Sequence, residues 1–376
     1  MWKIQLFKLN FDSREVDAVR QTVESGWLTM GERITDFESG FSTYLGGGAQ
    51  SLAVANGTAA LHMALLALDV GPGDEVVIPA LTFVADANAV RLVGAKPVLA
   101  DCSSLDDWNM SVETIERCIT PKTKAVMIVH YAGYPCDMPS IVDLCRRRDV
   151  RLIEDVAHAP GASVAGRSCG AWGDIGCYSF FSNKNLSIGE GGMVTSCSAE
   201  LIQRMKYLRS HGMTTLTLDR HKGRAITYDV AEPGLNYRMD EMRASIGLVQ
   251  LDKLPTGNAR RKDLTDRYRS NLAGSGISMP FSSLPADSVS AYHILPVLLP
   301  KDADRKAVIE NMKAKGIQSS IHYPPFWNFT AYAGQYSPDD TPVAAEICER
   351  ELTLPLYPTM SDEEVDLVTT SLLESL

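Results

Sequence analysis

The stretch GAWGDIGCYSFFSNKNLSIGEGG, residues 170–192, decides how the rest of the chain is interpreted. It predicts a short apolar strand from Ile175 to Phe181, then a polar turn that carries Lys184, then a glycine-rich loop at 189–192. An amine just past a buried strand can lose its solvent. A lysine whose charge is disfavoured by burial can attack an aldehyde and hold it as a Schiff base. The ordinary alternative is a solvated surface lysine, so further features have to decide.

The composition narrows the classes of protein to consider. The chain has 376 residues, of which 45% are hydrophobic and 22% charged, and its formal net charge is -10. These values are typical of a globular protein that is long enough for more than one domain. The acidic balance argues against a nucleic-acid-binding protein, which would carry a basic face.

The sequence also contains no membrane-spanning or secretory signal. No apolar run reaches spanning length, and Lys3 and Lys8 interrupt the apolar residues of the N-terminus. We therefore expect a cytoplasmic protein that binds no membrane. The 8 cysteines include no C-x-x-C pair and the 7 histidines show no ligand spacing, so we expect buried thiols and no metal site.

Strands and helices alternate from residue 52 to residue 155. This pattern predicts an α/β fold with a mostly parallel central sheet and helices on both faces. Right-handed crossovers place the loops that follow the strands on one edge of such a sheet, where ligands bind. The predicted strands are 52–55, 76–79, 97–100, 125–130 and 152–155, and the predicted helices between them are 59–68, 83–93, 111–118 and 141–148.

The pattern changes after the lysine turn. A long helix is predicted from Asp240 to Asn271, and its length suggests a connection between domains. We expect residues 1–250 to form a large domain and residues 251–376 a smaller α+β domain led by this helix. In the smaller domain we predict strands at 293–299 and 317–319 and helices at 305–315 and 363–373.

Gly57, Thr58 and Ala59 begin a helix that is apolar on nearly every side. The first backbone N–H groups of a helix have no intrahelical acceptor and lie at the positive end of its dipole, so they bind phosphate well. The alternative is a simple N-cap by Asn56 or Thr58 with nothing bound.

Asp155 ends a predicted strand in IEDVAHAPGA, residues 153–162. A carboxylate there could meet a ring nitrogen and keep it protonated, as pyridoxal enzymes require; the alternative is an aspartate that caps the next turn. His158 lies one turn further and could reach the same ligand, or it could be a satisfied structural group.

Three more residues have both a functional and a structural interpretation. Phe83 follows a predicted strand and could stack on a planar ring, or it could belong to the core. Ser179 could donate to a phosphate or cap a turn. Asn236, shortly before the long helix, could also donate to a phosphate, or it could cap that helix.

Five segments together resemble one family. They are NGTAALHMALLALDVGPGDEVVIPALTFVADANAV at 56–90, GAKPVLAD at 94–101, IEDVAHAPGA at 153–162, GDIGCYSFFSNKNLSIGEGG at 173–192 and GLNYRMDEMRASIGLVQL at 234–251. In this order and spacing they look like the DegT/DnrJ-type sugar aminotransferases. That family belongs to the fold type I, aspartate-aminotransferase-like enzymes that use pyridoxal 5'-phosphate (PLP). The resemblance runs from about residue 26 to the C-terminus and includes IHYPP at 321–325.

The resemblance implies roles for the candidate residues. Lys184 resembles the lysine that binds the cofactor and moves the proton, and Asp155 the partner of the pyridine nitrogen. Phe83 matches the aromatic residue that stacks on the ring, and His158 the residue beside it. Asn236 matches a residue that reaches the phosphate from the neighbouring subunit, which implies a homodimer with shared active sites. The implied phosphate ligands are Gly57, Thr58, Ala59 and Ser179.

The resemblance also implies where the substrate binds. Five residues fall where such enzymes hold a nucleotide sugar. Two are Thr29 and Met30, in the N-terminal segment (residues 1–30) that contributes to the site, and the others are Lys222, Arg224 and Tyr323. Some relatives carry histidine at the position of Lys184 and dehydrate their substrate, so the lysine favours amino transfer.

The expected reaction moves an amino group from L-glutamate, or glutamine, to a nucleotide-linked keto sugar. We expect C4 of dTDP-4-keto-6-deoxyglucose, which would give a 4-amino-4,6-dideoxyhexose for a natural product or glycan. The alternatives are C3 of a dTDP-3-keto-6-deoxyhexose and a cyclitol of the scyllo-inosose type. A non-catalytic PLP-binding regulatory protein is an alternative of another class. A nucleotide-binding Rossmann protein is disfavoured, because the first βα turn lacks G-x-G-x-x-G.

Overall fold

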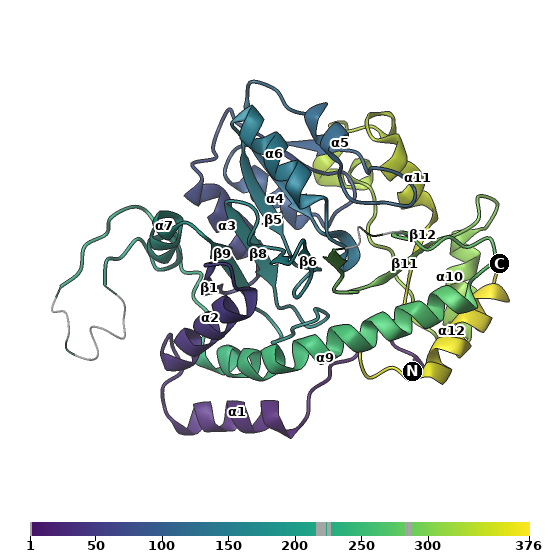
Figure 1. Ribbon diagram of the computed structural model, residues 1–376, viewed down its shortest axis with the longest axis horizontal. Helices are drawn as coiled ribbons and strands as arrows, with labels where there is room; N and C mark the ends of the chain where they lie inside the picture. Colours follow the sequence, from purple (N-terminus) through teal and green to yellow (C-terminus); the bar gives the residue numbers. More distant parts are fainter. Residues whose placement is uncertain (1, 216–222, 224–226, 283, 285–286) are drawn as a thin grey trace.

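A seven-stranded sheet forms the centre of the computed structural model, which describes residues 2–215, 223, 227–282, 284 and 287–376 (Figure 1). The strand order is β1-β9-β8-β5-β4-β2-β3. The strands are β1 (Gln50–Val54), β2 (Glu75–Pro79), β3 (Lys96–Ala100), β4 (Thr123–Val129), β5 (Arg151–Asp155), β8 (Ile175–Ser179) and β9 (Gly192–Ser196).

The sheet is mostly parallel, as the alternation of strands and helices predicts. Strands β3, β2, β4, β5 and β8 pair in parallel, whereas β9 pairs antiparallel with both β8 and β1. All strands of the parallel group therefore end on one edge, and β1 ends there too. The α/β fold class expected from the sequence is confirmed by this sheet and by the helices around it.

Helices surround the sheet, and those between β1 and β5 lie close to the predicted positions. α1 begins after Asp12, whose side chain accepts the Arg14 N–H within a capping box with Glu15. α3 is buried on nearly every side, as its apolar sequence predicts. These helices are α1 (Ser13–Glu24), α2 (Glu32–Leu45), α3 (Gly57–Ala67), α4 (Ala85–Leu92), α5 (Val112–Glu116), α6 (Met138–Arg148) and α7 (Ala199–Arg209). Among the described residues, no helix combines the length and the apolar composition that a membrane crossing needs.

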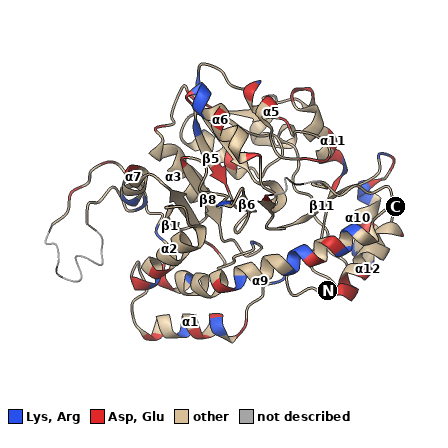
Figure 2. Cartoon of the chain, viewed as in Figure 1, with Lys and Arg blue, Asp and Glu red and all other residues tan. Residues whose placement is uncertain are grey.

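The long helix α9 (Glu241–Asn271) runs along the molecule toward α12 (Asp362–Leu373) (Figure 1). Basic and acidic side chains are interspersed along α9, whereas the charged side chains of α12 are all acidic (Figure 2). Arg267 pairs with Asp366 at 2.5 Å, and Arg260 with Asp362 at 2.8 Å. α9 crosses residue 250, where the sequence predicts a domain boundary, so that division stays a proposal.

The C-terminal third differs from the prediction at two strands and one helix. β11 (Leu295–Leu298) pairs with β12 (Glu351–Leu354), and α10 (Arg305–Ala314) lies between them in sequence. The predicted strand at 317–319 is wrong, because its residues form only isolated bridges. Ile317 bridges to Ile4 and Ser320 to Thr353, so no continuous ladder forms. β12 and the preceding helix α11 (Pro342–Arg350) were not predicted.

Strand β5 sends successive side chains to opposite sides, as any strand does. Asp155, the last residue of β5, and Glu154 therefore point to opposite faces of the sheet, and Glu154 is fully buried. Glu154 accepts backbone N–H groups from Gly170, Trp172 and Gly173 at 2.7 to 2.8 Å and lies 3.1 Å from His130 Nε2. These bonds fix the loop that leads into β8 and thus toward Lys184.

The substitution Glu154→Gln tests this anchor. The NH₂ group of the new amide would face backbone N–H groups that now donate to the carboxylate. We therefore expect the free energy of unfolding to fall by about 2–4 kcal/mol. Urea denaturation measures the change. The exposed carboxylate variant Glu116→Gln is the control and should stay within about 0.5 kcal/mol of the parent protein. Equal stabilities of the two variants would contradict the proposed anchor.

Candidate active site

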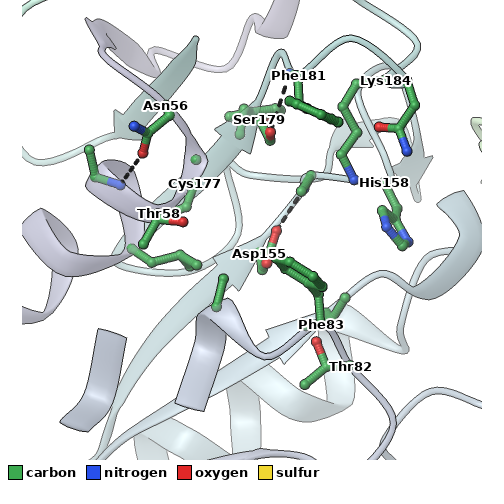
Figure 3. Close-up of a pocket in the computed structure, with 18 of the residues that line it drawn as sticks. Asn56, Thr58, Thr82, Phe83, Asp155, His158, Cys177, Ser179, Phe181 and Lys184 are labelled. Carbon is green, nitrogen blue, oxygen red and sulfur yellow. Dashed lines mark hydrogen bonds between the residues drawn. The ribbon is translucent and has the colours of Figure 1, made fainter. Parts of the chain in front are cut away.

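A cavity of about 630 Å³ opens at the carboxyl edge of the sheet. The ends of β1, β2, β4, β5 and β8 surround it, together with a segment from the C-terminal third. Figure 3 shows Lys184, Asp155, Phe83 and Ser179 pointing toward this common space. The sequence-predicted residues that line it are Gly57, Thr58, Ala59, Phe83, Asp155, His158, Ser179, Lys184 and Tyr323.

Lys184 sits in the turn after β8, and its neighbour Asn185 fixes that turn. The Asn185 side-chain amide donates to Asn258 Oδ1 at 2.8 Å and to the Ala291 carbonyl at 2.7 Å. Its oxygen lies 2.8 Å from His293 Nδ1. Burial lowers the pKa of Lys184 to about 8, although the carboxyl groups of Asp155 and Asp86 oppose this shift. Roughly a tenth of the amine is therefore uncharged at pH 7, far more than for a solvated lysine.

Asp155 is the last residue of β5 and lines the cavity. Its Oδ1 accepts the Ala157 N–H at 2.7 Å, and no described protein donor is bonded to its Oδ2. Burial raises the pKa of Asp155, while the Ala157 N–H and the Lys184 amine favour the ionised form. The second oxygen is thus available for a cationic N–H group of a ligand.

The N-terminus of α3 forms the opposite end of the cavity. Asn56 Oδ1 caps the helix by accepting the Ala59 N–H at 2.8 Å. Within the described chain, the N–H groups of Gly57 and Thr58 have no protein acceptor. Ser179 Oγ accepts the Phe181 N–H at 3.4 Å, so its own proton is free to donate. A Cβ built on Gly57 would lie 2.8 Å from Ser179 Cβ, so only glycine allows this close approach. The Asn56 cap therefore leaves the first two amides of the helix available to an anion.

A model of the DegT/DnrJ/EryC1/StrS aminotransferase family matches residues 10–373. The chain belongs to this family. It is therefore a PLP-dependent sugar aminotransferase, as the resemblance in the sequence implied, and the alternative of a non-catalytic PLP-binding protein is not retained.

Individual relatives agree over almost the whole chain. The dTDP-4-dehydro-2,3,6-trideoxy-D-glucose 4-aminotransferase of Saccharopolyspora spinosa is 36% identical over 367 residues, which cover 96% of this chain and 94% of that protein. The structure of the aminotransferase TlmJ from Streptoalloteichus hindustanus has a TM-score of 0.90 at 35% identity and covers 100% of this chain and 98% of that one. The PLP form of Spr1654 from Streptococcus pneumoniae has a TM-score of 0.90 at 31% identity, with 97% and 96% covered.

The cavity of this family member fits PLP in three places. The free amides at the α3 N-terminus and the Ser179 hydroxyl can take a phosphate. The free oxygen of Asp155 can take a pyridine N–H, and the Lys184 amine can reach an aldehyde. Phe83 lines the same space and can cover a planar ring. Within the described residues, no group of His, Cys, Asp and Glu side chains is arranged to hold a metal ion.

His158 and Tyr323 form a hydrogen-bonded pair at the cavity wall. The Ala132 N–H donates to His158 Nδ1 at 3.2 Å, so the proton of the neutral ring lies on Nε2. Nε2 then donates to Tyr323 Oη at 2.9 Å, which leaves the tyrosine proton to donate into the cavity. Burial, with Lys184 and His322 nearby, lowers the pKa of His158 well below its ordinary value, so the ring is neutral.

Several predicted residues lie elsewhere. Thr29 is exposed, Met30 is half-buried, and neither lines the cavity of the single chain. Asn236 is exposed and does not line it either, which fits a residue that acts from a neighbouring subunit. Lys222 and Arg224 lie outside the described residues.

Other cavity residues were missed from the sequence. Thr82 and His322 line the cavity beside residues that were identified, and Tyr237 follows Asn236 directly. His322 had a signal, since it stands in the IHYPP segment that carries the resemblance. Thr82 and Tyr237 gave no signal beyond their positions in the quoted motifs.

The buried amine predicts a pH-dependent stability in the cofactor-free protein. The folded state binds fewer protons than the unfolded state between pH 8 and 10.5, so stability should rise with pH through this window. Below pH 8 the full penalty of the buried charge remains. We expect Lys184→Met to be more stable than the parent at pH 7 by roughly 2 kcal/mol, and the difference to vanish above pH 10.5.

Chemical denaturation at several pH values measures this difference. Lys301→Met is the control, because the Lys301 side chain is 75% exposed, and it should show no such dependence. If the stability of the parent and that of Lys184→Met changed with pH in the same way, the amine would be solvated.

Proposed function

We propose that the enzyme transfers an amino group from L-glutamate to C4 of dTDP-4-keto-6-deoxyglucose. The Saccharopolyspora spinosa relative, which is named for 4-amination of a dTDP-linked deoxy sugar, supports the carbon and the nucleotide. The observation that carries the proposal is a lysine, not a histidine, with a depressed pKa inside the cavity. Amination at C3 and a cyclitol substrate remain the alternatives that the assay below distinguishes.

We assign each residue of the chain a task. When bound, PLP supplies an electron-withdrawing ring that takes up the donor's amino group and passes it on. The Lys184 amine binds the aldehyde carbon, and it takes and returns protons at Nζ because its pKa lies near the working pH. Asp155 holds a proton on the ring nitrogen by staying ionised. Phe83 covers the ring and excludes water from it.

The remaining residues hold and orient ligands. The amides of Gly57 and Thr58 and the hydroxyls of Thr58 and Ser179 bind the phosphate. His158 positions Tyr323, whose hydroxyl donates to an oxygen at the reacting carbon or the ring. The hydrogen bond between His158 and Tyr323, which both line the cavity, supports this assignment.

We propose a homodimer with shared active sites. Two observations support it. Phe83 and Phe181 line the cavity yet are 56% and 43% exposed in the single chain, as apolar residues at an interface would be. Asn236 is exposed and lies outside its own cavity, so the partner's copy can complete the phosphate site.

The substrate assignment is tested with dTDP-4-keto-6-deoxyglucose and L-glutamate. We expect formation of a 4-amino-4,6-dideoxyhexose nucleotide, identified by NMR of the product. Lys184→Ala should lower kcat by at least about a hundredfold, because nucleophile and proton carrier are lost together. Lys301→Ala should behave as the parent. No turnover, or an amine at C3, would reject the proposed substrate.

The shared site is tested by mixing two crippled variants. Lys184→Ala and Asn236→Ala should each be impaired. Refolding them together should restore up to about a quarter of the parent sites, because half of the dimers are mixed and one of the two sites in each mixed dimer is intact. Activity in the mixture that equals only the average of the two variants would contradict a site built from both subunits.

A further inference from the structure

Asp86 is a buried carboxyl group that the mechanism above does not use. It lies in the first turn of α4 and is 1% exposed. Its Oδ2 accepts the Thr82 hydroxyl at 2.5 Å. Its Oδ1 has no hydrogen-bond donor within the described part of the chain. A buried carboxyl oxygen without a donor needs an explanation, because such a group is costly to leave unpaired.

The neighbour of Asp86 is Asp155. The charge of Asp155 and its hydrogen-bonding contact raise the cost of ionising Asp86, whereas the same contact favours the ionised form of Asp155. Two carboxylates in contact cannot both be charged at moderate cost, so the pair holds one proton. A proton between them also gives the unpaired oxygen of Asp86 a partner.

The surroundings decide which of the two keeps the proton. Asp155 accepts the Ala157 N–H and faces the Lys184 amine, and both favour its ionised form. Asp86 receives only the Thr82 hydroxyl and is more deeply buried. Burial, and then the charge of Asp155, raises the pKa of Asp86 well above its ordinary value.

We propose that Asp86 is a protonated acid that donates a hydrogen bond to Asp155 and thereby holds Asp155 ionised beneath the ring nitrogen of the bound cofactor. Asp86 is a positioning residue, since it acts only through Asp155. The inference rests on the proposed function of Asp155 as the partner of that nitrogen.

The donor matters because Asp155 is itself buried. Burial alone would make Asp155 a stronger base and draw the proton from the ring nitrogen onto its carboxylate, which would leave the ring a weaker electron acceptor. The hydrogen bond from Asp86 opposes this shift. The other titratable groups that act on the pair are Lys184, His130, Cys177 and Tyr323.

Two substitutions separate the donor from the charge. Asp86→Asn imitates the protonated acid, because its amide oxygen can accept from Thr82 while its NH₂ donates to Asp155. Asp86→Ala removes the donor. Asp101→Asn is the matched control, since Asp101 accepts backbone N–H groups of Val343 and Ala344 and does not line the cavity.

The first measurement uses the cofactor-free protein. Infrared difference spectra between the parent and Asp86→Asn at pH 7 should show the loss of one protonated-carboxyl C=O band, which Asp101→Asn should retain. Absence of that band in the parent overturns the inference, because Asp86 would then be ionised. This measurement depends neither on activity nor on Asp155 binding the ring.

The second measurement uses the holoenzyme loaded with PLP labelled with ¹⁵N in its ring. The nitrogen should be protonated in the parent and in Asp86→Asn, and its NMR shift should move toward the unprotonated value in Asp86→Ala. kcat should fall by about tenfold to a hundredfold in Asp86→Ala alone, the range for a lost hydrogen bond to a charged group. Equal shifts in Asp86→Ala and Asp86→Asn overturn the inference.

The two measurements also separate this inference from the proposed function. If the parent shows the carboxyl band but an unprotonated ring nitrogen, and Asp155→Asn leaves that nitrogen unchanged, then the assignment of Asp155 fails. The claim that Asp86 acts on the cofactor falls with it, while the protonated pair itself stands. If Asp86→Ala does not fold, the infrared comparison of the parent with Asp86→Asn still decides whether Asp86 is protonated.

Discussion

The structure buries one amine, Lys184, beside the acidic side chains of a cavity, and the site depends on that burial. In water the amine would stay charged and could not bind an aldehyde. Burial alone would make it too weak a base to return protons. The carboxyl groups of Asp155 and Asp86 limit the shift, so the pKa settles at about 8. The same burial, together with the charge of Asp155, raises the pKa of Asp86, the group that we propose keeps a proton.

The sheet makes this arrangement available. Parallel strands end on one edge, so side chains at the ends of β5 and β8, far apart in sequence, face one cavity. The helix α3, which packs against β8, brings its positive end to the same edge. Residues of the C-terminal third close the wall, because Tyr323 reaches His158. One topology thus brings together the positive helix end that can bind a phosphate, the carboxylate that can bind a ring nitrogen and the amine that can bind an aldehyde.

Much of this could be predicted from the sequence, and the reasons differ by residue. The strands up to Asp155 were found because buried parallel strands are continuous apolar runs between turn signals. Lys184 and Asp155 were found because polar residues directly follow such runs. The strand at 317–319 was wrong, because Ile317 pairs with the N-terminal Ile4 through a single bridge and the local pattern cannot reveal that. Asp86 was overlooked because only the folded chain brings it to Asp155.

The central claim is that PLP binds covalently to the buried amine at position 184. Borohydride reduction of the holoenzyme, followed by peptide mass spectrometry, tests it most directly. The account predicts that the reduced cofactor is attached to the peptide that contains Lys184, at one cofactor per chain, and to no other lysine. Attachment to a different lysine, or a Lys184 peptide that stays unmodified in a protein that holds PLP, would contradict the account.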